Sequence, residues 1–136
     1  MMIDDIADYL ESASTALTIG GATGTLAKAD MNDAMPDTVA VLYETAGTAS
    51  QFAFSTTTGN IDEVFRYPSL QVLTRGVSYP DARTLAGTIY TALNGVRATV
   101  GGTVYEVVAI QTPFSIGRDA NERYLVSCNY QMVIPV

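Results

Sequence analysis

A strand, a tight turn and a helix follow one another in residues 68–95, PSLQVLTRGVSYPDARTLAGTIYTALNG, and this stretch constrains the fold more than any other. Ser78 and Asp81 stand three residues apart, as in a helix capping box, and Pro80 fits the first helical turn, where its missing N–H is not needed. Asn94-Gly95 is a helix stop. Between these signals, apolar residues recur at helical spacing: Ala82, Leu85, Ala86, Ile89 and Leu93. The pattern predicts a helix that begins at Ser78 and ends at Asn94-Gly95.

The remaining elements follow from the same helical and alternating periodicities. Pro68 should either bulge its strand or keep it at a sheet edge. A short strand at residues 25–29 is an open alternative. The order α-β-β-α-β-β-β predicts an α+β fold, a mostly antiparallel sheet with two helices, in a single domain over residues 1–136. Its expected elements are a helix at Ile3–Ala16 and strands at Thr38–Glu44, Ile61–Thr74, Arg97–Val100, Thr103–Thr112 and Glu122–Ile134.

Residues 46–60, AGTASQFAFSTTTGN, are small and polar around two aromatic side chains. The segment is typical of a long loop or an extended hairpin arm, and loops of this length are commonly functional. Two interpretations of Phe52 and Phe54 stay open. They either pack within a hairpin or act as apolar anchors for a neighbouring protein.

Charge is unevenly distributed along the chain, whose net charge is −7. Residues 1–65 carry ten acids and only Lys28 as a base, whereas residues 66–136 carry four acids and six arginines. The acidic part either is a solvated surface or pairs with the basic part of a neighbouring copy. A net acidic chain lacks the basic patch that sequence-independent nucleic-acid binding needs.

The acidic N-terminal residues argue against a cleaved secretory signal, and no run approaches the roughly 18 apolar residues of a membrane span. Cys128 is the single cysteine, so no intrachain disulfide forms. The chain is therefore expected to be made in the cytoplasm, without a membrane partner.

No catalytic arrangement is visible in the sequence, which contains no histidine for a triad or a general base. Cys128 lies on the apolar side of a predicted strand, which is typical of a buried structural thiol. Residues 30–33 begin like a calcium loop, but Met35 and Val41 stand where a glycine and an acid are required. Residues 20–24 lack the Lys-Ser/Thr pair of a phosphate loop. We expect no enzyme activity, no cofactor and no metal.

The order of short motifs, by contrast, resembles a known family. The motifs run from the N-terminal helix through Met35-Pro36-Asp37, a strand ending Tyr43-Glu44, Leu70–Gly76, Tyr79, Leu93-Asn94-Gly95, Tyr105, Gln111-Thr112-Pro113 and Gly117-Arg118-Asp119. This succession covers Ile3 to Val136 and departs from the family pattern at residues 45–60. It is similar to the tail terminator and minor capsid proteins of long-tailed, siphovirus-type bacteriophages.

The resemblance implies a virion structural protein at the head-tail interface. Such a protein assembles as a homo-oligomeric ring, usually a hexamer, that caps the head-proximal end of the tail tube. It docks to the tail tube protein on one side and to a head-completion or connector protein on the other. DNA passes through the lumen without specific binding, which suits an acidic wall that repels phosphates.

Loops and strand edges are expected to carry the contacts, namely residues 18–34, 46–60 and 117–121. For Arg75 the alternative is a role in stabilising its own turn, and for residues 117–121 it is a plain polar turn. The predicted interface residues are Arg75, Arg118, Asp119, Asn121, Phe52 and Phe54.

Other functions compete with this hypothesis. Within the virion, the chain is alternatively a tail tube or head-tail connector subunit. From another class, it is a small non-viral binding adaptor that acts as a monomer or dimer. A hydrolase that uses Asp62 and Glu63 is disfavoured, because neighbouring residues of a strand point to opposite faces.

Overall fold

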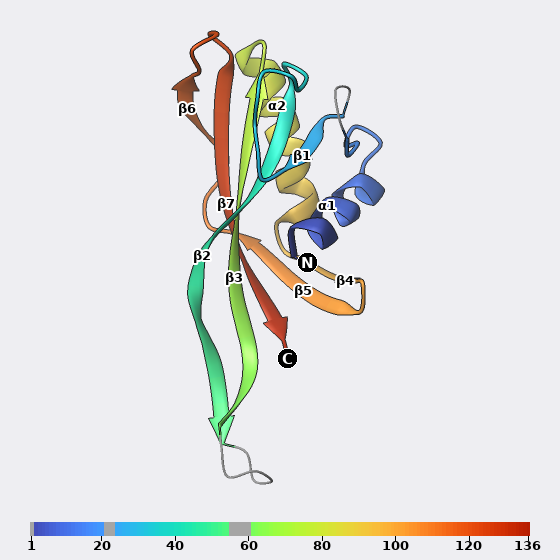
Figure 1. Cartoon of the computed structure of the whole chain (residues 1–136), viewed down its shortest axis with the longest axis vertical. Helices are drawn as coiled ribbons and strands as arrows, with labels where there is room; N and C mark the ends of the chain where they lie inside the picture. Colours follow the sequence, from blue (N-terminus) through green and yellow to red (C-terminus); the bar gives the residue numbers. More distant parts are fainter. Residues whose placement is uncertain (1, 21–23, 55–60) are drawn as a thin grey trace.

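The computed structural model describes residues 2–20, 24–54 and 61–136, and in them two helices lie against one seven-stranded sheet (Figure 1). The strand order is β1-β2-β3-β7-β5-β4, and β6 pairs with β7 on the same side as β5. In chain order the elements are α1 (Met2–Ala13), β1 (Leu26–Lys28), β2 (Val39–Phe54), β3 (Ile61–Gly76), α2 (Tyr79–Leu93), β4 (Val96–Val100), β5 (Thr103–Ala109), β6 (Phe114–Arg118) and β7 (Tyr124–Pro135).

The sheet is mixed, and the expectation of a mostly antiparallel sheet is wrong. β1 runs parallel to β2, with Leu26 opposite Ala40. The parallel pairing arises because residues 29–38 return the chain to the end of the sheet at which β1 begins, so that β2 runs in the same direction beside it. The Ala29 N–H then bonds the Leu42 carbonyl, and the Ala40 N–H bonds the Thr25 carbonyl, each at 2.8 Å.

The predicted element order α-β-β-α-β-β-β also lacked two strands, β1 and β6, although β1 confirms the short strand that was left open at residues 25–29. β1 has three residues, too few for an alternating pattern to stand out. All five residues of β6 are exposed, so its sequence carries no buried-and-exposed alternation. Both strands exist because a longer neighbour, β2 or β7, offers its edge to them.

Both helices cover the same face of the sheet (Figure 1), and the hydrophobic core lies between the two layers. The alternation predicted for the last strand is confirmed, since its inward side chains are buried there. The main core members are Ile3, Ile6 and Leu10 of α1, Leu85, Ile89 and Leu93 of α2, and Leu42, Leu70, Val72, Cys128, Tyr130 and Met132 of the sheet.

The predicted start of α2 is confirmed. Ser78 is the N-cap, and its hydroxyl accepts a hydrogen bond from the Asp81 N–H at 3.3 Å. Pro80 stands in the first turn, and the predicted apolar stripe is the buried face of the helix. The two-residue turn at Gly101-Gly102 is confirmed as well, because both glycines adopt the left-handed conformation that such a hairpin requires.

The outer halves of β2 and β3 form an arm, residues 45–54 and 61–67, that extends away from the helices (Figure 1) and is two-stranded beyond Phe65. Residues 46–54, expected as a loop or arm, continue β2, while residues 55–60 lie outside the described residues. β3 lies between β2 and β7, so Pro68 is not on an edge strand. The irregularity beside it falls on the partner strand, where the register shifts between Thr45 and Thr48.

Gly47 stands at this shift, where the arm leaves the body of the protein. A Cβ atom at this position would collide with the carbonyl oxygen of Tyr67 and lie 3.0 Å from the Cα of Pro68. Only glycine allows the two backbones to approach so closely here. The base of the arm is therefore a tight backbone contact.

Candidate interaction surfaces

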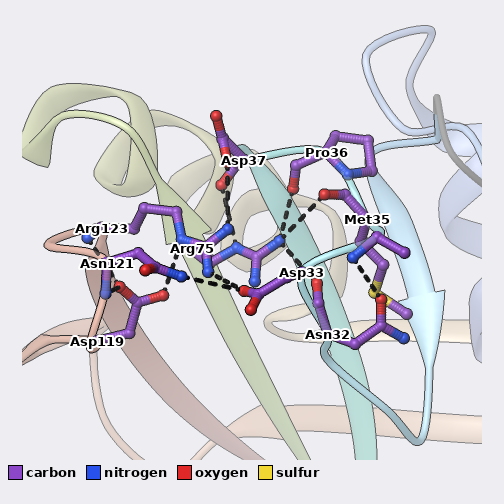
Figure 2. Close-up of polar contacts among 10 residues, drawn as sticks. Asn32, Asp33, Met35, Pro36, Asp37, Arg75, Asp119, Asn121 and Arg123 are labelled. Atoms are coloured by element: carbon purple, nitrogen blue, oxygen red, sulfur yellow. Dashed lines mark hydrogen bonds and ion pairs between the residues drawn. The ribbon is translucent and has the colours of Figure 1, made fainter.

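Two arginines and three aspartates join residues 29–38 to the turn at 119–123 (Figure 2). We call Arg75, Arg123, Asp33, Asp37 and Asp119 the arginine cluster. It lies at the end of β3 opposite the arm, and because Arg75 alternates with the core residues Leu70 and Val72, its side chain points to the sheet face away from the helices. The cluster brings together segments that are up to 90 residues apart in the sequence.

Arg75 is buried, with 2% of its surface exposed, and its guanidinium donates to backbone carbonyls. Nε bonds the Asp37 carbonyl at 3.3 Å, and Nη2 lies 2.8 Å from the Pro36 carbonyl oxygen. Nη2 is also 3.2 Å from the Asn32 carbonyl and 3.3 Å from that of Met35. Burial, and then the neighbouring positive charge of Arg123, lower the pKa of Arg75. Arg75 therefore fastens residues 32–37 onto the sheet.

Arg123 binds three carboxylates at once. Its Nη2 contacts Asp33 at 2.5 Å, its Nε contacts Asp119 at 2.8 Å and its Nη1 contacts Asp37 at 3.1 Å. The hydrogen bond with Asp33, followed by those with Asp119 and Asp37, raises the pKa of Arg123 above its usual value. Only 11% of this side chain is exposed, so the network is partly shielded from solvent.

Asp119 shapes the turn that presents Arg123. Its Oδ1 accepts the backbone N–H groups of Asn121 and Arg123, each at 2.9 Å. Glu122 takes a left-handed conformation with φ of 61° to close the turn. Burial would raise the pKa of Asp119, but the bonds that it accepts from Arg123 and Asn121 lower it below its usual value. The turn is thus held by one carboxylate.

A surface hollow of about 480 Å³ lies between the two joined segments, with Tyr43, Leu73 and Leu125 among its lining. The guanidinium groups at its wall already bind carbonyl and carboxylate oxygens. In the described residues no group of three or more His, Cys, Asp or Glu side chains is placed to hold a metal ion. The arginine cluster therefore has the geometry of a structural contact that holds residues 29–38 against the turn at 119–123.

All seven basic side chains of the protein make a polar or cation–π contact within the subunit. Four form ion pairs, at 2.7 Å for Lys28 with Asp4, 2.6 Å for Arg66 with Glu63, 3.3 Å for Arg97 with Glu106, and through the cluster for Arg123. Arg75 and Arg83 bond carbonyls, Arg83 that of Pro113. The Arg118 guanidinium stacks on the Tyr124 ring, 4.5 Å from its centroid.

The structure brings three of the predicted interface residues together, because Arg75, Asp119 and Asn121 all line the hollow. Arg118 lies next to them on β6, and its Nη2 also bonds the Tyr124 hydroxyl. Phe52 is separate, half-exposed on the arm. Phe54 ends β2, and its side chain lies outside the described part of the chain.

Sequence reasoning missed Arg123, Asp33 and Asp37. The spacing of Asp119 and Arg123 within one turn-rich segment was the available local signal. The partners Asp33 and Asp37 are too distant in sequence for any local pattern to connect them with Arg123. Residues 21–23, part of the predicted contact segment 18–34, lie outside the described residues.

Comparison with known proteins identifies the family. A family model described as "Bacteriophage tail terminator protein" matches residues 17–135. A solved structure from the virion of a native gene transfer agent particle has a TM-score of 0.57 at 10% identity, with coverage of 98% of this chain and 96% of that one. A second solved structure has a TM-score of 0.53 at 15% identity, with coverage of 96% and 89%.

No curated protein sequence matches the chain. In the described residues no helix is long and apolar enough to cross a membrane. The two solved structures, at 10% and 15% identity, show a shared fold, and the family model spans most of the sequence. The chain therefore belongs to the bacteriophage tail terminator family, whose members are structural components of the phage virion.

Proposed function

We propose that this protein forms a ring at the head-tail junction, most simply a hexamer, that caps the head-proximal end of the tail tube. In this role it binds the tail tube protein on one face of the ring and a head-completion or connector protein on the other. Membership of the tail terminator family is the observation that carries the proposal. The protein is made in the host cytoplasm and acts in the assembled virion.

The distribution of charge supports a ring lumen through which DNA passes without binding to the protein. The net charge is −7, and every basic side chain already has a partner inside the subunit. A phosphate backbone therefore meets no free cluster of lysines and arginines, which is what non-specific DNA affinity requires. An acidic wall instead repels phosphates and lets the duplex slide.

The test combines the purified chain with the tail tube protein of the same phage. Sedimentation velocity measures the mass of the free protein, and electron microscopy measures tube length as the protein is added. We expect a closed ring, alone or on tube ends, and tubes that stop growing once capped. Open-ended fibres of the chain itself would instead show a tube subunit. A monomer indifferent to tube ends would leave the adaptor function.

A further inference from the structure

We propose that neighbouring copies in this ring are joined by strand addition, in which the outer edge of β2 in one copy pairs with the outer edge of β6 in the next. The inference rests on the proposed function, because it names the contact through which that ring closes. Strand addition supplies main-chain hydrogen bonds along an exposed edge, and side chains on alternate positions add specificity.

The outer edge of β2 is long and unprotected. β1 covers β2 only from Ala40 to Leu42, and beyond that point β2 pairs with β3 alone in the described part of the chain. Natural edge strands usually carry charges or proline, which discourage pairing with another chain. From Thr45 to Asn60 the sequence contains no Asp, Glu, Lys, Arg or Pro. An edge of this kind favours a partner strand.

The arm also needs a partner for its own stability. Pairing between β3 and β7 reaches only as far as Phe65 opposite Pro135, so the end of the arm has two strands. There Phe52 and Ile61 expose 51% and 56% of their surfaces. A two-stranded hairpin is at best marginally stable in water, and a third strand is the usual remedy.

β6 offers the complementary edge. Each of its residues is exposed, it pairs with β7 alone among the described strands, and Phe114 and Ile116 are exposed by 43% and 48%. The other two sheet edges, β1 and β4, carry charges that discourage strand pairing. Lys28 ends β1, and Arg97 of β4 pairs with Glu106. β6 is therefore the open edge that best matches the uncharged outer half of β2, because its one charged residue, Arg118, is stacked on Tyr124.

The distribution of charge favours a second copy of the chain as the partner of the open β2 edge. The bases of this chain are held by partners within the subunit, so the acidic surface of one copy finds few available bases on another. Contacts between copies then fall to surfaces without charge, and residues 45–54 of β2 and residues 114–117 of β6 are such surfaces. They lie toward opposite ends of the long axis (Figure 1). Copies joined through them are related head to tail, which closes into a ring when the rotation allows.

Charge reversal tests this pairing. Ala49→Lys places a charge on the exposed edge of β2, and Ile116→Glu places the opposite charge on β6. Each single variant should weaken ring assembly by about tenfold or more, because a lone charge is buried against an apolar strand. The double variant, and an equimolar mixture of the two single variants, should restore assembly. Thr99→Lys on the edge of β4 is the matched control and should assemble like the wild type.

Sedimentation velocity gives the ring fraction, and circular dichroism checks that each subunit is folded. A disulfide trap gives a second measurement that does not depend on introduced charge. The variant carrying both Ala49→Cys and Ile116→Cys should oxidise into a covalent ladder, while either single cysteine should not. The native thiol of Cys128 is buried and stays out of the reaction.

The outcomes separate the two proposals. Single variants that form rings as the wild type does, or a double variant that stays dissociated, would overturn strand addition and leave the ring itself intact. If Ala49→Lys still forms rings but no longer caps tubes, the edge is covered by the tube protein, and strand addition between copies is overturned. A wild type that forms no closed ring, alone or on tube ends, would refute both proposals.

Discussion

β3 begins in the arm at Ile61 and reaches the arginine cluster at Arg75. Its two ends differ in the number of neighbouring strands and hydrogen-bond partners that the subunit itself supplies. At Arg75 the strand lies between β2 and β7, and a buried guanidinium binds four carbonyls. At Ile61 it pairs with β2 alone in the described part of the chain. One end of the subunit therefore has its bonding complete within a single chain, whereas the other is the end that the proposed strand addition would complete.

Arg75→Met is expected to have the largest effect, because it removes the donor on which residues 32–37 depend. We expect a loss of about 3 kcal/mol in the free energy of unfolding, since buried carbonyls are left without a partner. Urea unfolding measures it. Arg97→Met is the matched control, because Arg97 is 71% exposed and its ion pair with Glu106 contributes little. Equal losses in the two variants would show that the buried Arg75 guanidinium contributes no more to stability than an exposed ion pair does.

Arg75→Lys tests whether the charge or the planar guanidinium of Arg75 holds residues 32–37. Lysine keeps the charge but not the planar fork that reaches several carbonyls at once. Its stability should fall between those of the wild type and Arg75→Met. A lysine variant as stable as the wild type would mean that charge alone holds the segment.

The sequence predicted these two ends with unequal success. α2 and the alternation of β7 were predictable because each is a long, regular pattern with a clear cap or face. Arg75 was singled out as an interface residue, and that role stays a prediction; its partners within the subunit are backbone carbonyls, which no side-chain pattern reveals. Arg123 was missed because its carboxylates at Asp33 and Asp37 meet it only in the folded chain.

The arm was the harder end to predict. Residues 46–53 alternate weakly because β2 there has no buried face, so a strand could not be told from a loop by periodicity. The same reason hides β6, whose residues are all exposed. Strands that lack a buried face within one chain leave little trace in the sequence, and β2 and β6 are the two to which the proposed strand addition assigns a partner.

Gly47→Ala tests the base of the arm. The added Cβ has no room against Tyr67 and Pro68, so we expect a loss of about 2 kcal/mol, measured by urea unfolding. Hydrogen exchange should quicken in the outer half of β2 and stay slow in β7. Gly87→Ala is the control, because its Cβ meets no atom within 4 Å on α2, and alanine should stabilise that helix by up to about 1 kcal/mol. Unchanged exchange in the arm of Gly47→Ala would show that the tight contact does not hold it.

Asp119→Asn tests how the arginine cluster responds to acid. Because the folded state lowers the pKa of Asp119, the unfolded chain takes up this proton first as the pH falls. The stability that Asp119 contributes is therefore complete above its unfolded pKa of about 3.9 and is lost as the pH falls through the lower folded value. The asparagine variant should have a urea midpoint about 0.5 M lower at pH 7 and a shallower loss of stability in acid. An acid profile as steep as that of the wild type would assign the loss to other carboxylates.

The smallest effect is expected from Arg66→Gln in the arm, where an ion pair stands in solvent. Arg66 is 59% exposed, and its bond to Glu63 at 2.6 Å is screened by water and salt, so the melting temperature should change by less than about 1 °C. The pKa of Glu63 is lowered first by a hydrogen bond from Ser50 and then by Arg66. Ser50→Ala should therefore raise the pKa of Glu63 more than Arg66→Gln does, as measured by NMR titration of the carboxyl group. If Arg66→Gln instead lowered the melting temperature as much as Arg75→Met, the arm would be as complete in the monomer as the arginine cluster, and strand addition would have no unfinished edge to fill.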